Sequence, residues 1–345
     1  MHAPYEREPY DSYICHRTAQ AWEISKLFRK AAERGHLVIG IGDFNMVPKS
    51  LAHRLITTHS PVQDVWLSLH PDSSIGSADD PVERMRQRPI PTAGYNILKN
   101  GATCDSILNT WRWSKDQQKQ LGPNKPALGV SQERLDPRAK RLDYIFVNTK
   151  SHSKGDNWTI KSCKVGMLSR HPRLQCSLSD HFSVEATLVN YIYAQSPESK
   201  YDTNIVNGVY LQSPSSSENR SSQVNSSTTF LPLNIYDEVL SLVYKYRRRE
   251  KWQRRIRLSH FAGSLVFSIA CFFAVSWSSN GYSVLIITIL STLNLSAGVI
   301  DGLIGGLFIG SEIRALKEFE WEISNTRAMA CGEPHIMPEE GIIDW

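Results

Sequence analysis

The sequence predicts a mixed α/β domain followed by a membrane hairpin of two helices. Over the front half of the chain, short apolar runs typical of strands alternate with segments of helical period. A segment rich in Ser, Asn, Thr and Gln follows, with few large apolar residues. Two apolar spans then lie close together near the C-terminus, each long enough to cross about 30 Å of hydrocarbon as a helix.

The front half supplies the elements of the α/β domain. Apolar residues recur with an approximate 3.6 period over residues 15–34, which predicts a helix that ends at Gly35. Residues 37–41 are a continuous apolar run, typical of a strand covered on both faces. We further expect a helix, a loop and two strands, at residues 51–57, 71–91, 141–148 and 182–189.

Changes in composition divide the chain into five segments. A segment with so few large apolar residues cannot bury a core, so the polar stretch is predicted to be a flexible linker. The segments are an α/β domain, this linker, a basic helix, a transmembrane hairpin with a trailing helix, and a tail, at residues 1–193, 194–233, 234–257, 258–325 and 326–345.

Charge and cysteine usage narrow the class of protein. The formal net charge of +5 is modest and does not resemble the basic stripe of a nucleic-acid-binding domain. The six cysteines are irregularly spaced, without a Cys-x-x-Cys pair, so we predict neither a zinc site nor a disulfide framework. This usage fits a reducing compartment.

Much of the positive charge lies directly before the first apolar span. Seven Lys and Arg residues fall within residues 247–257. Such a block beside a membrane span is typical of an anchor for anionic phospholipids, although a solvated basic helix has the same composition. Because basic flanks stay cytosolic, the catalytic part is expected to face the cytosol, and both the endoplasmic reticulum and the mitochondrial outer membrane fit.

The second apolar span carries glycines at intervals of four, which would lie on one helix face. They predict a close packing seam, either against the first span or against a second copy of the chain in a homodimer. Asp301 lies beside them and is costly at membrane depth unless it is paired, but the sequence does not identify its partner. The four glycines are Gly298, Gly302, Gly306 and Gly310.

Polar motifs follow or precede the predicted strands. Asp43 and Asn45 come two residues apart after the strand at 37–41, so both side chains are able to project to one side. A carboxylate and an amide placed there can handle a proton and hold a phosphate oxygen. A turn rich in Asp and Asn is the alternative interpretation.

Two further motifs supply a base and its orienting group. Asp143 is flanked by apolar residues and needs a partner, which is either His181 or a structural salt bridge to Arg141 or Lys140. If Asp143 accepts a hydrogen bond from His181, it fixes the tautomer of that base. Asp180 would then point away from His181, toward a hard cation.

The order of these motifs resembles that of the DNase I-like endonuclease/exonuclease/phosphatase superfamily. The similarity is closer to one branch, the neutral sphingomyelinases and the fungal inositol phosphosphingolipid phospholipases C, which also end in a membrane hairpin. It extends over residues 1–190 and about 235–325. It is carried by HAPY, YICHRTAQAWE, GDFNM, RLDY and SDH, at residues 2–5, 13–23, 42–46, 141–144 and 179–181.

The resemblance implies a DNase I-like four-layer sandwich and Mg²⁺-dependent cleavage of a sphingolipid phosphodiester to ceramide and a phosphorylated head group. His181 would be the general base and Asp143 would orient it. Asn45 would position the phosphate, Asp43 would assist proton transfer, and Asp180 would contribute to the metal environment. The head group stays open among sphingomyelin, inositol phosphorylceramide and lysophospholipids.

The sequence departs from this family at its beginning. In the family, an upstream half of the sandwich carries an Asn and a metal-binding Glu, and no residues precede Met1 here. We therefore expect an incomplete sandwich without the main Mg²⁺ ligand. A catalytically inactive, membrane-bound fragment is the alternative function. A nuclease or an inositol phosphatase of the same fold is disfavoured by the hairpin.

Overall fold

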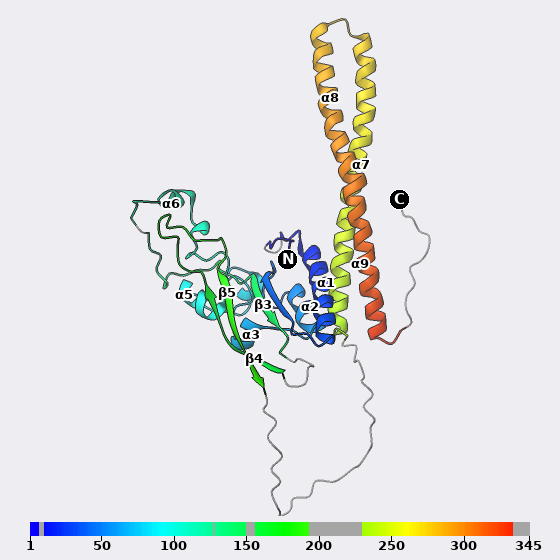
Figure 1. The fold of residues 1–345 in the computed structure, drawn as a ribbon. Coiled ribbons are helices and arrows are strands. Elements are labelled where there is room, and N and C mark those ends of the chain that lie inside the picture. Colours follow the sequence, from blue (N-terminus) through cyan, green and yellow to red (C-terminus); the bar gives the residue numbers. More distant parts are fainter. Residues whose placement is uncertain (7–9, 127, 150–155, 193–229, 334–345) are drawn as a thin grey trace, which may run out of the picture.

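The computed structural model describes residues 1–6, 10–126, 128–149, 156–192 and 230–333 (Figure 1). The predicted linker at 194–233 therefore lies almost wholly outside the described residues. The same holds for most of the predicted tail at 326–345. Within the described part, the front half is a mixed α/β unit, and the back half is a long helical hairpin that rises from its side (Figure 1).

A small antiparallel sheet brings two of the polar motifs together. Its strands are β1 (Ile39–Asp43), β3 (Asp143–Val147) and β2 (Gln63–Asp64), in the order β1-β3-β2. In the register of β1 with β3, Asp43 lies directly opposite Asp143. The sheet therefore places two carboxylates side by side at one end, where each of these strands meets a loop.

A second sheet of two strands follows, and the motif at residues 179–181 lies in the loop before its last strand. It pairs β4 (Asp156–Gly166) with β5 (Ser183–Ile192), with an irregularity between Ile160 and Ser162. The sequence analysis did not predict β4, because lysine and serine on its exposed side weaken the strand pattern. It did predict β5, whose first residue follows the motif that ends in His181 by two positions.

Two helices, both predicted from the sequence, cover one face of the three-stranded sheet. These are α1 (Ile14–Glu33) and α2 (Leu51–His59), and the Ser50 side chain accepts a hydrogen bond at the start of α2. Their apolar sides enclose a core with aromatic side chains of β3. Its fully buried members include Trp22, Leu55, Ile56, Tyr144 and Phe146.

The prediction that the strand after Gly35 is covered on both faces is wrong for the described residues. On one face of β1, Gly40 lies so close to the Phe28 ring of α1 that a side chain would collide with it. On the other face, Ile39 and Ile41 are 48% and 71% exposed. Among the described strands, β1 pairs only with β3, so it is an edge strand with one open face.

The segment between β2 and β3 contains only short helical turns, and the loop predicted at 71–91 includes one of them, α4. Their positions matter because they support the loops around the strand ends. They are α3 (Val65–Leu69), α4 (Pro81–Arg84), α5 (Ala93–Tyr95), η1 (Asn96–Asn100), η2 (Thr110–Arg112) and α6 (Lys115–Lys119).

The C-terminal half forms a helical hairpin. The basic helix and the first apolar span are one helix, α7 (Leu233–Trp277), and α8 (Gly281–Leu303) returns beside it. The chain continues through η3 (Ile304–Phe308) into α9 (Ile309–Ala330), so the trailing helix passes the predicted boundary at 325. Both arms contain a stretch long and apolar enough to cross a membrane.

The base of the hairpin is packed into the α/β unit. Tyr236, Val239 and Val243 of α7 are fully buried in the same core as α1 and α2, and Ile323 of α9 joins them. Ion pairs across this junction include Lys26 with Glu322. The apolar half of the hairpin projects away from the domain (Figure 1), and its direction is therefore fixed relative to the sheets.

The glycines of the second span form a seam, but its members differ from those predicted. Gly298 and Gly302 face Ser264 and Phe261 of α7 so closely that side chains would clash. A step of four residues overshoots a helical turn of 3.6 residues by about 40°, so the next glycine to face α7 is Gly305, three residues after Gly302, instead of Gly306. A Cβ placed on Gly306 or Gly310 would meet no heavy atom within 4 Å.

Asp301 has partners on the opposite helix. Its carboxylate accepts hydrogen bonds from the Arg257 guanidinium and from Nδ1 of His260, the latter at 2.7 Å. Both partners lie where the basic block ends and the apolar span of α7 begins. An ionised group near the hydrocarbon is thus neutralised by the neighbouring arm of the hairpin.

Candidate active site

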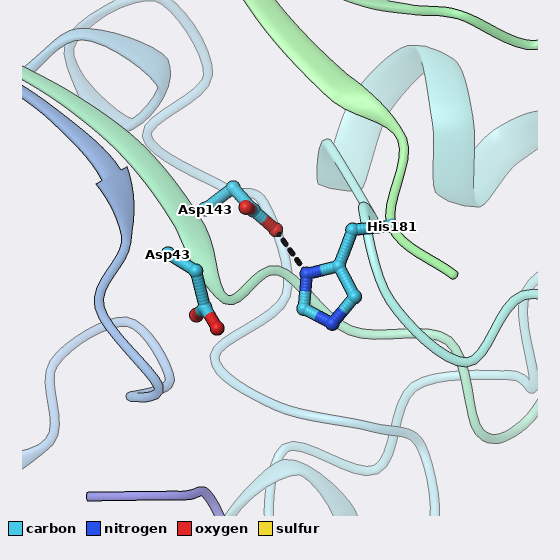
Figure 2. Close-up of side chains that lie close together, drawn as sticks. All are labelled: Asp43, Asp143 and His181. Atoms are coloured by element: carbon cyan, nitrogen blue, oxygen red, sulfur yellow. Dashed lines mark hydrogen bonds and ion pairs between the residues drawn. The ribbon is translucent and has the colours of Figure 1, made fainter. Parts of the chain in front are cut away.

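The ends of β1 and β3 and the loop before β5 meet at one cluster of titratable groups. Asp43, Asp143 and His181 each offer a ligand atom within 4.8 Å of the others (Figure 2). Three segments that are distant in the sequence supply them. They are the only such group of three among the described residues.

The contact predicted between Asp143 and His181 is present. Nδ1 of His181 lies 2.8 Å from Oδ2 of Asp143, drawn as the dashed line in Figure 2. The alternative salt bridges of Asp143 are absent from the described residues, because Arg141 pairs with Asp64 and Lys140 pairs with Asp105. The hydrogen bond to Asp143 holds a proton on Nδ1 of His181. Nε2 is therefore the ring nitrogen that can face a reactant.

Backbone hydrogen bonds fix both partners. The amide of Phe182, next to His181, donates to the carbonyl of Thr103 at 2.9 Å. The Thr103 hydroxyl accepts from the amide of Asp143 at 3.3 Å. The Phe182 ring is buried, so the residue directly after His181 is held in place.

Neighbouring groups and burial raise the pKa values of His181 and Asp43. Hydrogen bonds that the imidazole donates to Asp143 first, and to the Cys104 sulfur second, raise the pKa of His181 to about 11. Burial, reinforced by the neighbouring charge of Asp143, raises the pKa of Asp43. Paired titratable groups with perturbed pKa values in a partly buried site are typical of active sites.

Asn45 lies beside this cluster and bonds to the N-terminal segment. Its side-chain amide donates to the Met1 carbonyl at 2.9 Å, and its Oδ1 accepts from the Tyr5 amide at 3.2 Å. Its own backbone amide donates to Oδ1 of Asp43 at 2.7 Å. The backbone has a φ of 47°, a left-handed conformation that asparagine tolerates better than most residues.

Asp180 is not brought into the cluster. Its side chain is exposed, and it accepts a hydrogen bond from the Ser179 hydroxyl at 3.2 Å. Its backbone carbonyl, like that of Ser179, accepts from the Asn109 side chain at 3.0 Å. The role predicted for Asp180 in the metal environment therefore stays a prediction, and its evident part is to shape the loop before His181.

Sequence comparison adds the relatives of this chain. It is 33% identical over 331 residues to the inositol phosphosphingolipids phospholipase C of Schizosaccharomyces pombe, covering 95% of this chain and 64% of the relative. The Saccharomyces cerevisiae protein of the same name is 30% identical over 325 residues, covering 94% of this chain and 58% of the relative. This chain is a homologue of the inositol phosphosphingolipid phospholipases C. The resemblance drawn from the motifs is thereby confirmed.

A more distant similarity extends to the neutral sphingomyelinases. A putative neutral sphingomyelinase of Caenorhabditis elegans is 31% identical over 186 residues, covering 54% of this chain and 35% of that protein. No family model matches the sequence. The chain spans less than two thirds of the length of the two phospholipase C relatives.

The sequence analysis missed a buried ion network behind the site of this phospholipase C homologue. Arg141 donates two hydrogen bonds to Asp64, at 2.9 and 2.8 Å, and Nε2 of His53 lies 3.0 Å from the same carboxylate. Although burial opposes it, Arg141 lowers the pKa of Asp64. Arg141 belongs to the RLDY motif, two residues before Asp143. Its partner Asp64 lies far away in the sequence, so no local pattern indicates the pair.

A cavity of about 450 Å³ lies elsewhere in the molecule. Its walls come from the N-terminal segment, the start of α2, the α4 turn and the polar side of α7. None of Asp43, Asp143 and His181 lines it. We assign the chemistry to the carboxylate–imidazole cluster, because that is where reactive groups converge.

The donor set at the cluster fits a hard divalent cation. Mg²⁺ prefers carboxylate oxygens and keeps several waters, so it needs only one or two protein carboxylates. Asp43 and Asp143 present such oxygens from adjacent strands. Burial and the facing charge of Asp143 both disfavour the ionised form of Asp43. A bound cation would offset this by stabilising the two carboxylates.

Proposed function

We propose that this chain is a Mg²⁺-dependent sphingolipid phosphodiesterase of the phospholipase C type. Its substrate would be an inositol phosphosphingolipid or sphingomyelin, and its products ceramide and a phosphorylated head group. The observation that carries the proposal is the 2.8 Å hydrogen bond between Asp143 and His181 beside Asp43. The phospholipase C relatives and the two membrane-length helices support a lipid substrate.

In this proposal each residue has a distinct role. His181 removes a proton from the attacking water through Nε2, while Asp143 orients the ring and stabilises the imidazolium that forms. Asn45 positions a non-bridging phosphate oxygen, and Asp43 assists proton transfer at the reacting oxygens. Mg²⁺, held by carboxylates with Asp180 in its surroundings, supplies positive charge to the phosphoryl oxygens when bound.

The proton affinity of His181 has a consequence for this role. With a pKa of about 11, raised chiefly by Asp143, the ring is protonated at neutral pH in the cation-free site. Positive charge at Asp43 and Asp143 opposes that proton and brings the pKa down toward the working pH. The geometry therefore favours base catalysis in the cation-loaded site over catalysis in the bare one.

The membrane attachment that we propose rests on the basic block. Arg248, Lys251 and Arg255 have no ion pair among the described residues, and the neighbouring Trp252 is 63% exposed. Free cations and an exposed tryptophan at the start of an apolar span fit the headgroup region, with anionic phospholipids as partners. The catalytic part would face the cytosol, on the endoplasmic reticulum, the mitochondrial outer membrane or both.

A homodimer would form on the surface of the hairpin that α7 of the same chain does not cover. Gly298 and Gly302 are covered by α7 of the same chain, whereas Gly306 faces no neighbouring atom. A second copy of the chain would therefore approach along the exposed side of Gly306 rather than along all four predicted glycines, since Gly310 is buried.

Head-group release from lipid vesicles tests the proposed reaction. The 345-residue chain is reconstituted into vesicles that contain anionic phospholipid and either inositol phosphorylceramide or sphingomyelin. We expect release of the phosphorylated head group with Mg²⁺, loss of release on chelation, and recovery when Mg²⁺ is added back. The preferred substrate identifies the head group.

The absence of release from both lipids would contradict the proposal. It would favour the second candidate, a catalytically inactive membrane-bound chain that binds lipid or a partner. The observation that favours this candidate is that Asp180 lies outside the cluster, which leaves two carboxylates there among the described residues. A nuclease or an inositol phosphatase is disfavoured, because neither soluble substrate requires two membrane-length helices.

A further inference from the structure

A positively charged lobe lies next to His181 and has no part in the reaction described above. It consists of residues 110–126, which include η2 and α6, and residues 167–178, which connect β4 to β5. Together these two segments contain six Lys and Arg residues and one acidic residue, Asp116. The cations are Arg112, Lys115, Lys119, Lys125, Arg170 and Arg173.

Hydrogen bonds join the two segments into one unit. The amide of Thr110 donates to the Ser177 hydroxyl at 3.1 Å, and the amide of Ser177 donates back to the Thr110 hydroxyl at 2.8 Å. The Gln175 side chain donates to the Lys125 carbonyl at 3.0 Å. The lobe is therefore held as one surface rather than as two independent loops.

Apolar side chains stand exposed on this charged lobe. Trp111 is 60% exposed, although its indole nitrogen donates to the Ser177 carbonyl at 3.1 Å. Leu178 and Leu174 are 55% and 47% exposed. A fixed tryptophan and leucines surrounded by cations form the side-chain combination that partitions into the headgroup region of a bilayer.

The lobe lies on the side of the domain toward which the hairpin projects. In Figure 1, α6 is at the upper edge of the α/β unit, and α7 and α8 extend upward from it. The packed base of α7 fixes this arrangement. A bilayer entered by the hairpin would therefore be met by this edge of the domain, whereas the far ends of β4 and β5 point away from it.

We propose that the lobe contacts the anionic surface of the same bilayer that the hairpin enters. Trp111 and Leu178 enter the headgroup region, and the surrounding cations bind lipid phosphates and carboxylates. Leu178 precedes His181 by three residues, and Asn109 ties the two loops together. This contact holds the active site at the lipid surface, so that a head group reaches it while the lipid tails stay in the bilayer. The inference rests on the proposed membrane anchoring.

Photo-crosslinking to lipid tests the contact without requiring turnover. The photoreactive amino acid p-benzoylphenylalanine replaces Leu178 or, separately, Trp111 in the full chain, reconstituted into phosphatidylcholine vesicles with or without phosphatidylserine. Thr159, exposed near the far end of β4, is the negative position, and Ile286 on α8 is the positive one. We expect lipid adducts, detected by mass spectrometry, at 178, 111 and 286, and far fewer at 159.

A charge variant tests the electrostatic part. Lys115→Gln with Arg173→Gln is expected to lower the adduct yield at position 178 about fivefold or more on phosphatidylserine vesicles, since each cation near such a surface favours contact by about that factor. Lys161→Gln, an exposed cation on β4, is the matched control and should change little.

The outcomes separate this inference from the proposed reaction. Adducts at 286 with yields at 178 and 111 no higher than at 159 would overturn the lobe contact while leaving hydrolysis untouched. Equal yields on both kinds of vesicle, insensitive to the charge variant, would overturn its anionic specificity. Absence of adducts at 286 would refute the anchoring, and the inference would fall with it.

Discussion

Replacing His181 by alanine is expected to lower the rate of Mg²⁺-dependent head-group release by about 10²–10⁴-fold, the usual contribution of a positioned general base. The reason is that His181 is the one imidazole in the cluster with Asp43 and Asp143. The rate is measured in vesicles at saturating Mg²⁺. A matched control is His36→Ala, which alters an exposed imidazole outside both this cluster and the lobe.

Asp143→Asn separates the role of the carboxylate from that of the ring. The hydrogen bond that the imidazole donates to Asp143 is the largest cause of the raised pKa of His181, so its loss should move that pKa from about 11 toward the ordinary 6.5. Histidine NMR signals in the cation-free protein report the shift. An unchanged pKa together with an unchanged rate would contradict the assignment of this pair.

The raised pKa also sets the sign of a stability effect. A histidine whose pKa is higher in the folded state stabilises the fold fully below its unfolded pKa, near 6.5, and this contribution disappears as pH rises through about 11. The Asp143→Asn variant should therefore lose its stability deficit relative to the parent at high pH. At neutral pH the parent should be the more stable protein.

Asp64→Ala is expected to lower the free energy of unfolding by about 3–5 kcal/mol, because it leaves the Arg141 guanidinium buried without its counter-charge. Arg141 is 1% exposed and already has one buried nitrogen, Nε, without a hydrogen-bond partner. The change also removes the acceptor for the Trp66 and Leu67 amides at the start of α3. Urea unfolding of the reconstituted chain, followed by tryptophan fluorescence, measures the loss.

An exposed pair provides the comparison for that measurement. Asp116 is ion-paired with Lys119 on α6, and both side chains are largely exposed. Asp116→Ala should change the free energy of unfolding by less than about 1 kcal/mol, as expected for a surface pair. If Asp64→Ala were no more destabilising than Asp116→Ala, the buried network would not support the strand that carries Asp143.

The sequence was informative where a pattern is local. The 3.6 period of α1, the apolar lengths of the hairpin arms and the polar motifs at the strand ends all depend on neighbouring residues. The pairing of Asp143 with His181 was also predictable, because a carboxylate among apolar residues needs a partner and few candidates were available. The DNase I-like sandwich itself stays a prediction, since the described sheets have three and two strands.

What the sequence did not yield depends on distant contacts. The exposed face of β1 follows from which elements pack against the sheet, and an apolar run carries no such information. Gly305 replaces Gly306 in the seam because a spacing of four drifts around a helix of 3.6 residues per turn, and the position of α7 decides which glycine meets it. The partners of Asp301 and of Arg141 lie on other elements, so only the fold brings them together.

Hydrolysis in water enriched in ¹⁸O tests the central claim most directly. The reconstituted chain acts on inositol phosphorylceramide with Mg²⁺, and mass spectrometry locates the label. Attack of water on phosphorus with ceramide leaving predicts ¹⁸O in the phosphorylated head group and none in ceramide, with release lost in His181→Ala. Label in ceramide or in the free head-group alcohol, or no reaction at all, would contradict the assignment of this chain as a sphingolipid phospholipase C.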